Sequence, residues 1–290
     1  MRRHAVLLIC AAACANRAVP KDISIEATYP HAVPYIASLP TQLRVATFNV
    51  HREAAGTVID GVTRDPALAN ADLILLQEVH RDERIPAACS AACALGKRLG
   101  YYTIYAPGHA QDTGSDGVAI LSRAPIHSME VVELPYFNVH LNSGRRVALA
   151  ATIDVAGTPV TVYAVHLDNR LTVGDRKRQM LPVLEHARRK TTPVIIAGDF
   201  NTGPVTWLTH VIPVLTNTQD DRLEELVREY GFATPVTGVH ATHRYLGMKL
   251  DAIYTRGFET TAFATANARN ISDHLALWAM LRPSTTVTKR

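Results

Sequence analysis

The chain has 290 residues, of which 47% are hydrophobic and 19% are charged, and its formal net charge is +4. This is the composition of a globular protein, and the charge is too weak to imply a nucleic-acid partner by itself. Once the N-terminus is set aside, no apolar stretch is long enough to span a membrane.

Residues 1–15 resemble an export leader. Arg2 and Arg3 precede a short apolar segment, and Ala13-Cys14-Ala15 matches a small-x-small cleavage site. The alanines before Cys14 also resemble a bacterial lipoprotein box, so a soluble protein and one tethered to a membrane through lipidated Cys14 both fit. We therefore expect an exported protein in the periplasm, in the cell envelope or outside the cell.

Removal of this leader leaves only two cysteines, Cys89 and Cys93. In an oxidising compartment these two can bond to each other. A zinc site needs about four ligands, and the stretch offers no companion pair. A disulfide is the preferred interpretation, with two free thiols on a helical segment as the alternative.

The chain then becomes regular. Residues 16–40 hold four prolines, which suits an irregular lead-in. Apolar runs of strand length follow at 43–48, 73–76, 118–121, 147–153, 160–165, 194–197, 250–254 and 275–281. Helical periodicity is clearest at 176–190 and 222–230. With no linker inside 41–283, the pattern predicts one α/β or α+β domain, followed by a polar tail at 284–290.

Polar side chains stand where these apolar runs end. In VIIAGDFN, we expect Gly198 to let the chain turn and Asp199 and Asn201 to point the same way. The other runs are bordered by Asn49, Glu78, His166, Asp251 and the pair Asp273-His274. Each alone also fits a turn, a cap or a core histidine. Together, hard oxygen ligands at strand ends suit Mg²⁺ or Mn²⁺ rather than zinc.

Seven segments in order, TFNVH, LLQEV, GVAILSR, VHLDN, AGDFN, LDAIY and ISDH, resemble the endonuclease/exonuclease/phosphatase superfamily. The resemblance spans about residues 43–282. It implies a four-layer sandwich, in which two packed β-sheets are flanked by helices and the site lies at one edge.

The same resemblance implies a divalent-metal site. Glu78 resembles the main carboxylate ligand of Mg²⁺ or Mn²⁺, and Asn49 and Asp273 resemble its supporting ligands. His51 and Arg146 are weaker candidates for contact with phosphate or substrate.

It also implies a set of catalytic residues. Asp199 corresponds to the group that orients or deprotonates the attacking water, and Asn201 to one that holds that water or a phosphate oxygen. His274 resembles a histidine whose tautomer is fixed by Asp251. His166 resembles the residue that stabilises the transition state or helps the leaving oxygen depart.

The expected activity is therefore metal-dependent hydrolysis of a phosphodiester or phosphomonoester by in-line attack of water. Nucleic acid, a phospholipid head group and a sugar phosphate all remain open as substrates. A catalytically inactive binding protein is less favoured, because the acids and the terminal histidine are all present. Trp207-Leu208 is a candidate apolar lip for a lipid, with a core position for Trp207 as the alternative. No protein partner is indicated, and we expect a monomer.

Overall fold

A computed structural model describes residues 20, 22–30, 36–85, 89–111, 113–137, 139, 144–216, 218–236, 238–239 and 241–284. The predicted leader, Cys14 and the tail beyond residue 284 lie outside these residues. The elements in chain order are β1 (Glu26–Thr28), β2 (Leu43–Asn49), α1 (Ala55–Arg64), α2 (Pro66–Ala69), β3 (Leu73–Asp82), α3 (Ala91–Leu99), β4 (Tyr102–Gln111), β5 (Gly114–Ser122), β6 (Ile126–Glu133), β7 (Val147–Val155), β8 (Thr158–His166), α4 (Val173–Arg188), β9 (Val194–Asp199), β10 (Val205–Leu208), β11 (Ile212–Leu215), α5 (Gln219–Glu229), β12 (Asp251–Arg256), β13 (Phe258–Ala266), the 3₁₀ turn η1 (Ala268–Asn270) and β14 (Ala276–Pro283).

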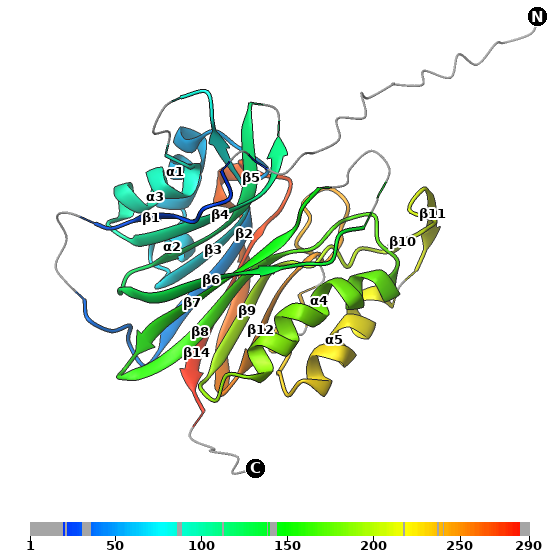
Figure 1. The fold of residues 1–290 in the computed structure, drawn as a ribbon. Coiled ribbons are helices and arrows are strands. Elements are labelled where there is room, and N and C mark those ends of the chain that lie inside the picture. The colour runs from blue at the N-terminus through cyan, green and yellow to red at the C-terminus, as the bar shows by residue number, and fades with distance from the viewer. Residues whose placement is uncertain are drawn as a thin grey trace, which may run out of the picture.

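Two large sheets pack face to face (Figure 1). Within the described residues, one sheet has seven strands in the order β1-β4-β5-β3-β2-β14-β13, and the other has five in the order β12-β9-β8-β7-β6. Side chains such as Leu75, Ile120, Leu149 and Val162 fill the space between them. Because these strands are buried on both faces, their sequences are nearly continuous apolar runs.

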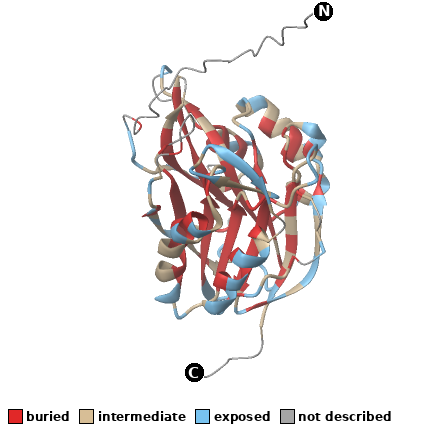
Figure 2. Cartoon of the chain, turned by 90° about the vertical axis from the view of Figure 1, so that its right-hand side faces the viewer, coloured by how far each residue is buried: buried red, intermediate tan, exposed pale blue. Residues whose placement is uncertain are grey.

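Helices cover the outer faces of both sheets and complete four layers. On the seven-stranded sheet, Val58 and Val62 of α1 and Leu95 of α3 pack in one core. On the five-stranded sheet, Met180 of α4 and Leu223 of α5 pack in another. Figure 2 shows buried strands between partly exposed helices. The predicted α+β sandwich of two packed sheets flanked by helices is confirmed. None of the helices in the described part of the chain is long and apolar enough to cross a membrane.

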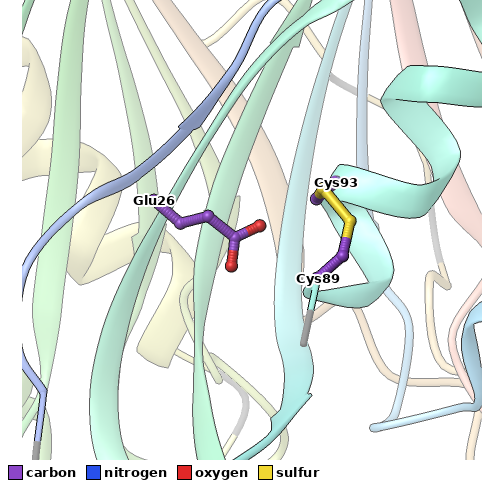
Figure 3. Close-up of side chains that lie close together, drawn as sticks. All are labelled: Glu26, Cys89 and Cys93. Atoms are coloured by element: carbon purple, nitrogen blue, oxygen red, sulfur yellow. A yellow bond between two sulfur atoms is a disulfide. The ribbon is translucent and has the colours of Figure 1, made fainter. Parts of the chain in front are cut away.

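Cys89 and Cys93 are joined by a disulfide at the start of α3, with their Cα atoms 5.5 Å apart. Figure 3 shows the carboxylate of Glu26, from β1, beside this disulfide. That carboxylate accepts hydrogen bonds from the backbone N–H of Ser90 at 3.2 Å and from its hydroxyl at 3.0 Å. Although Glu26, Cys89 and Cys93 lie close enough to hold a metal, the two sulfurs are bonded to each other and are not thiolate ligands.

The strand directions bring the polar chain segments to one edge. β2 runs parallel to β3, and β8 runs parallel to β9. Parallel strands end at the same edge, whereas the antiparallel β12 and β14 begin there. Asp251 thus pairs in register with Asp199, which in turn pairs with His166. This topology gathers residues that are more than two hundred positions apart in the sequence, such as Asn49 and His274.

Candidate active site

A cleft of about 440 Å³ opens at this edge. The predicted site residues that line it are His51, Glu78, Arg146, His166, Asp199, Asn201, Asp273 and His274. The other two, Asn49 and Asp251, are buried behind the lining residues, which they contact through hydrogen bonds. The structure therefore brings together all ten of the residues that the sequence indicates for catalysis, metal binding and substrate contact.

A β-bulge aims Glu78 into the cleft. Leu76 pairs with Ala119 of β5 and Val79 pairs with Gly117, so Gln77 and Glu78 together face the single residue between those partners. Such a bulge redirects one side chain of an otherwise regular strand. Glu78 has a φ of 51°, in the left-handed region that is costly for a residue with a Cβ. The backbone of Glu78 therefore departs from strand geometry at the residue whose carboxylate lines the cleft.

Asn49 links two carboxylates. Its Nδ2 donates to Oε1 of Glu78 and to Oδ2 of Asp199, each at 3.0 Å. Its Oδ1 accepts a hydrogen bond from the backbone N–H of His51 at 2.9 Å. Two acidic side chains from different sheets therefore converge on one buried amide group.

Asp199 and Asn201 form a compact turn at the end of β9. Oδ1 of Asp199 accepts from the backbone N–H of Asn201 at 2.9 Å, and Nδ2 of Asn201 donates to the carbonyl of Leu167 at 2.9 Å. Burial raises the pKa of Asp199 to about 7, against the opposing effect of His274. A carboxylate with such a pKa is suited to accept a proton near neutral pH.

The glycine before this turn has a different role from the predicted one. Gly198 lies inside β9, paired with Val165 and Ala252, and not at a turn. A Cβ on Gly198 would lie 1.9 Å from the carbonyl oxygen of Val165. Glycine is needed here because β8 and β9 approach closely, which positions His166 beside Asp199.

His274 is held between two carboxylates. Its Nδ1 lies 2.8 Å from Oδ2 of Asp251, and its Nε2 lies 3.7 Å from Oδ2 of Asp199. Burial alone would lower the pKa of His274, but Asp251 and Asp199 outweigh burial and raise it to about 10. The imidazole is therefore cationic at neutral pH, and the Asp251 contact fixes its orientation.

His166 has the opposite electrostatic character. Burial, followed by the guanidinium of Arg146, holds the pKa of His166 well below its ordinary value. Nη1 of Arg146 lies 3.0 Å from Nδ1 of His166. Arginine only donates hydrogen bonds, so Nδ1 is the acceptor and the neutral ring carries its proton on Nε2. That Nε2 faces Oδ2 of Asp199 at 3.7 Å and Oε1 of Glu78 at 3.9 Å.

Arg146 is itself fixed by residues that the sequence did not single out. Its Nε donates to Oδ1 of Asp168 at 2.7 Å. Oδ2 of Asp168 accepts from Nε2 of Gln179 on α4 at 2.8 Å, and the backbone N–H of Asp168 donates to Oε1 of the same Gln179 at 2.8 Å. Asp168 is part of the VHLDN segment that the sequence analysis noted. Its contacts with Arg146 and Gln179 depend on the fold and could not be predicted from the sequence. These contacts favour a positioning role for Arg146 behind His166.

Two further residues line the cleft, Arg52 and His243, and the sequence did not indicate either of them. Nε of Arg52 lies 3.3 Å from Oε2 of Glu78. Nε2 of His243 lies 3.6 Å from Oδ2 of Asp273, whose Oδ1 lies 3.7 Å from Nδ1 of His51. An isolated β-bridge between His243 and His274 holds His243 at the cleft. No local sequence pattern predicts this bridge.

The donor set fits a hard divalent cation. Glu78 and Asp273 are carboxylates that line an open cleft, and the Glu78 and Asp199 oxygens already converge on the amide of Asn49. Carboxylate oxygens are groups that Mg²⁺ and Mn²⁺ prefer, and in this structure Asn49 turns its Nδ2 toward them and its Oδ1 toward the backbone N–H of His51. Asp199, Asp251 and His274 are also close enough to hold an ion. However, Nδ1 of His274 is already hydrogen-bonded to Asp251, as expected for an acid–imidazole pair.

The two packed sheets and the acidic, amide and imidazole groups at their common edge define a layered α+β protein of the hydrolase type. The model of the Endonuclease/Exonuclease/phosphatase family matches residues 46–274, and the chain belongs to this family. Members of the family are hydrolases that act on phosphoester bonds. No curated protein matches the chain in sequence.

Solved structures share the fold. An endonuclease/exonuclease/phosphatase from Beutenbergia cavernae DSM 12333 is 25% identical, with a TM-score of 0.68, over 84% of this chain and 72% of that chain. The human Nocturnin catalytic domain, solved with a bound sulfate anion, is 18% identical, with a TM-score of 0.62, over 86% and 97%. TDP2 from D. rerio, complexed with a single-strand DNA product, is 17% identical, with a TM-score of 0.60, over 83% and 99%.

Proposed function

We propose that the protein is a divalent-metal-dependent phosphodiesterase that hydrolyses its substrate by in-line attack of water. The observation that carries this proposal is the convergence of Glu78 and Asp199 on Asn49, opposite the imidazoles of His166 and His274. Carboxylates that can hold a cation, with imidazole N–H groups facing the same part of the cleft, are suited to bind a phosphate that reacts there.

The cation is assigned to Glu78, with Asn49 and Asp273 as supporting ligands. When bound, Mg²⁺ or Mn²⁺ would neutralise negative charge on the phosphate oxygens. Hydrolysis of a diester builds negative charge on these oxygens, so the neighbouring cationic and hydrogen-bonding groups lower the barrier.

The protein's own groups handle the protons. Asp199 accepts the proton of the attacking water while the new P–O bond forms, and Asn201 holds that water in place. Nε2–H of His166 donates a hydrogen bond to a phosphate oxygen as the bond to the leaving oxygen breaks. The cationic His274, oriented by Asp251, offsets the developing charge. A pKa near 7 for Asp199 matches its role as a base at neutral pH.

The reaction is tested with bis-p-nitrophenyl phosphate and protein stripped of metal with EDTA. We expect no hydrolysis by the stripped protein and recovery on addition of Mg²⁺ or Mn²⁺, with the monoester p-nitrophenyl phosphate cleaved more slowly. Glu78→Gln should weaken activation by Mg²⁺, whereas Glu83→Gln, a matched change in the turn after β3, should not. Full activity in the presence of EDTA, or equal Mg²⁺ activation of both variants, contradicts the proposal.

Export is part of the same proposal and rests on residues 1–15. The charged start, the apolar segment and the Ala13-Cys14-Ala15 site support it. N-terminal sequencing of the protein from cell fractions tests it. A mature protein that begins at Asn16 indicates a soluble exported form, and a palmitate label on Cys14 indicates a lipid-anchored form. An intact N-terminus in the cytoplasm contradicts export.

A further inference from the structure

A small hairpin stands outside the two main sheets. Among the described residues, β10 and β11 pair only with each other, in an antiparallel ribbon that projects at the side of the molecule beyond α4 (Figure 1). We call residues 205–215 the apolar hairpin. Its sequence, VTWLTHVIPVL, has no acidic residue, lysine or arginine.

Large apolar side chains of this hairpin lie in water. Their exposed fractions are 50% for Leu208, 55% for Val211, 56% for Ile212, 38% for Val214 and 85% for Leu215. The pairs Leu208–Ile212 and Val205–Leu215 lie on opposite faces of the ribbon, because side chains alternate along each strand. An isolated two-stranded ribbon is barely stable in water, and a contiguous exposed apolar patch marks an interaction site.

The apolar hairpin continues directly into the active-site cleft. Val205 and Trp207 line the cleft, and Leu246, which is 60% exposed, lines it from a different loop. The neighbouring Tyr245 is 73% exposed. Asp199, His166 and His274 are buried polar groups of the cleft lining, whereas the apolar Trp207 and Leu246 are more exposed. A phospholipid has the same order of chemistry, a phosphodiester followed by acyl chains.

Cationic groups lie against the base of the hairpin. Cζ of Arg170 lies 5.2 Å from the centre of the Trp207 ring. Cζ of Arg178, which is also paired with Asp175, lies 5.6 Å from the centre of the Phe137 ring, which lies 6.4 Å from the ring of His210. Apolar side chains beside arginines match the interface of a membrane that contains anionic lipid.

We infer that the apolar hairpin inserts into a phospholipid bilayer and places the cleft over the phosphodiester head group of a lipid in that bilayer. This inference rests on the proposed function for its reaction, but its binding step is independent of hydrolysis. The interfacial position explains why apolar side chains on both faces of the ribbon are exposed.

Binding is tested by flotation of the full chain with vesicles of phosphatidylcholine, sphingomyelin and phosphatidylglycerol in equal parts. The variant Leu208→Ser/Ile212→Ser/Leu215→Ser removes three apolar side chains that do not line the cleft. We expect it to lose at least about tenfold in vesicle affinity, since each buried apolar side chain contributes to partition. Ile85→Ser, which changes an isoleucine 59% exposed on another loop, should bind like the wild type. Vesicles without phosphatidylglycerol should bind the wild type more weakly.

Measuring hydrolysis of a soluble diester and of vesicle lipid side by side distinguishes a failure of this inference from a failure of the proposed function. The triple variant should cleave bis-p-nitrophenyl phosphate like the wild type but release little head-group product from the vesicles. Wild-type protein that does not float, or a triple variant that floats equally well, overturns the inference, as does wild-type protein that floats and cleaves the soluble diester but releases no head-group product. A wild-type dimer that the triple substitution dissociates, without vesicle binding, also overturns it and assigns the hairpin to self-association. Failure to cleave the soluble diester overturns the proposed function alone.

Discussion

Asp251 lies directly behind His274, with 2.8 Å between Oδ2 and Nδ1, so that Nε2 of the imidazole faces Asp199. The other carboxylate oxygen of Asp251 is buried and has no hydrogen-bond partner among the described residues. The negative charge of Asp251 is therefore directed mainly at one imidazole. This relationship determines both the orientation and the protonation of His274.

Neutralising this carboxylate should slow the reaction. Asp251→Asn keeps the shape of the side chain but removes the charge that favours the imidazolium, so we expect kcat to fall by about 10²–10⁴-fold with little change in KM. The alkaline limb of the pH–rate profile should move to lower pH, because the pKa of His274 falls. Kinetics on bis-p-nitrophenyl phosphate across pH measure both effects. An unchanged profile would show that Asp251 does not act through His274.

The same pair predicts a pH dependence of stability. The folded-state pKa of His274 is raised to about 10 from its ordinary value of 6.5. A raised pKa contributes stability that is fully present below the unfolded-state pKa and is lost as the pH rises through the folded-state pKa. Between about pH 8 and about pH 10, the metal-free wild type should lose about 2 kcal/mol more than His274→Gln. Urea unfolding in EDTA measures this difference, and parallel curves for the two proteins would contradict it.

The buried pair of Arg146 and Asp168 should behave as a unit. Arg146→Met leaves the Asp168 carboxylate buried without its cation and should cost about 3–5 kcal/mol of unfolding free energy. Arg146→Met combined with Asp168→Leu should recover much of that loss, because no uncompensated charge remains. Chemical denaturation of the two single variants and the double variant measures the coupling. Strictly additive losses would show that the two side chains do not interact.

Gly198 should tolerate no side chain. Gly198→Ala places a Cβ against the carbonyl of Val165 and should destabilise the fold by about 1–3 kcal/mol through overpacking. It should also lower activity, since β8 carries His166 and β9 carries Asp199. Gly56→Ala, in α1, adds a Cβ that meets no described atom within 4 Å beyond its chain neighbours and its own helix backbone, and it should be neutral or stabilising by about 0.5–1 kcal/mol. Equal melting temperatures for the two variants would contradict the packing argument.

The buried strands could be predicted because a strand buried on both faces has a nearly continuous apolar sequence. All eight predicted runs fall on strands of the two sheets, and the two predicted helices correspond to α4 and α5. The missed strands of the two large sheets carry mixed sequences. β4 contains Pro107 and Gly108, and β13 is an edge strand with exposed threonines. Their pairing depends on tertiary contacts that local periodicity does not record.

Site residues could be predicted where they directly follow an apolar run in the sequence. They could not be predicted where tertiary contacts alone bring them to the site. Glu78 was found from its place after an apolar run, but the bulge that aims it depends on its pairing with β5. Gln179 and His243 lie in a helix and a loop, and only the fold brings them to Asp168 and Asp273. The sequence left two positions open for Trp207, an apolar lip or the core, and in the structure Trp207 is half-buried and lines the cleft.

We propose that this cleft hydrolyses phosphodiesters with Asp199 as the proton acceptor. The most direct test of this proposal is the rate of bis-p-nitrophenyl phosphate hydrolysis in Mg²⁺ by Asp199→Asn, beside the matched change Asp82→Asn outside the cleft. We predict a loss of at least about 10²-fold for Asp199→Asn and wild-type activity for Asp82→Asn, with both variants folded by circular dichroism. Wild-type activity in folded Asp199→Asn would contradict the claim.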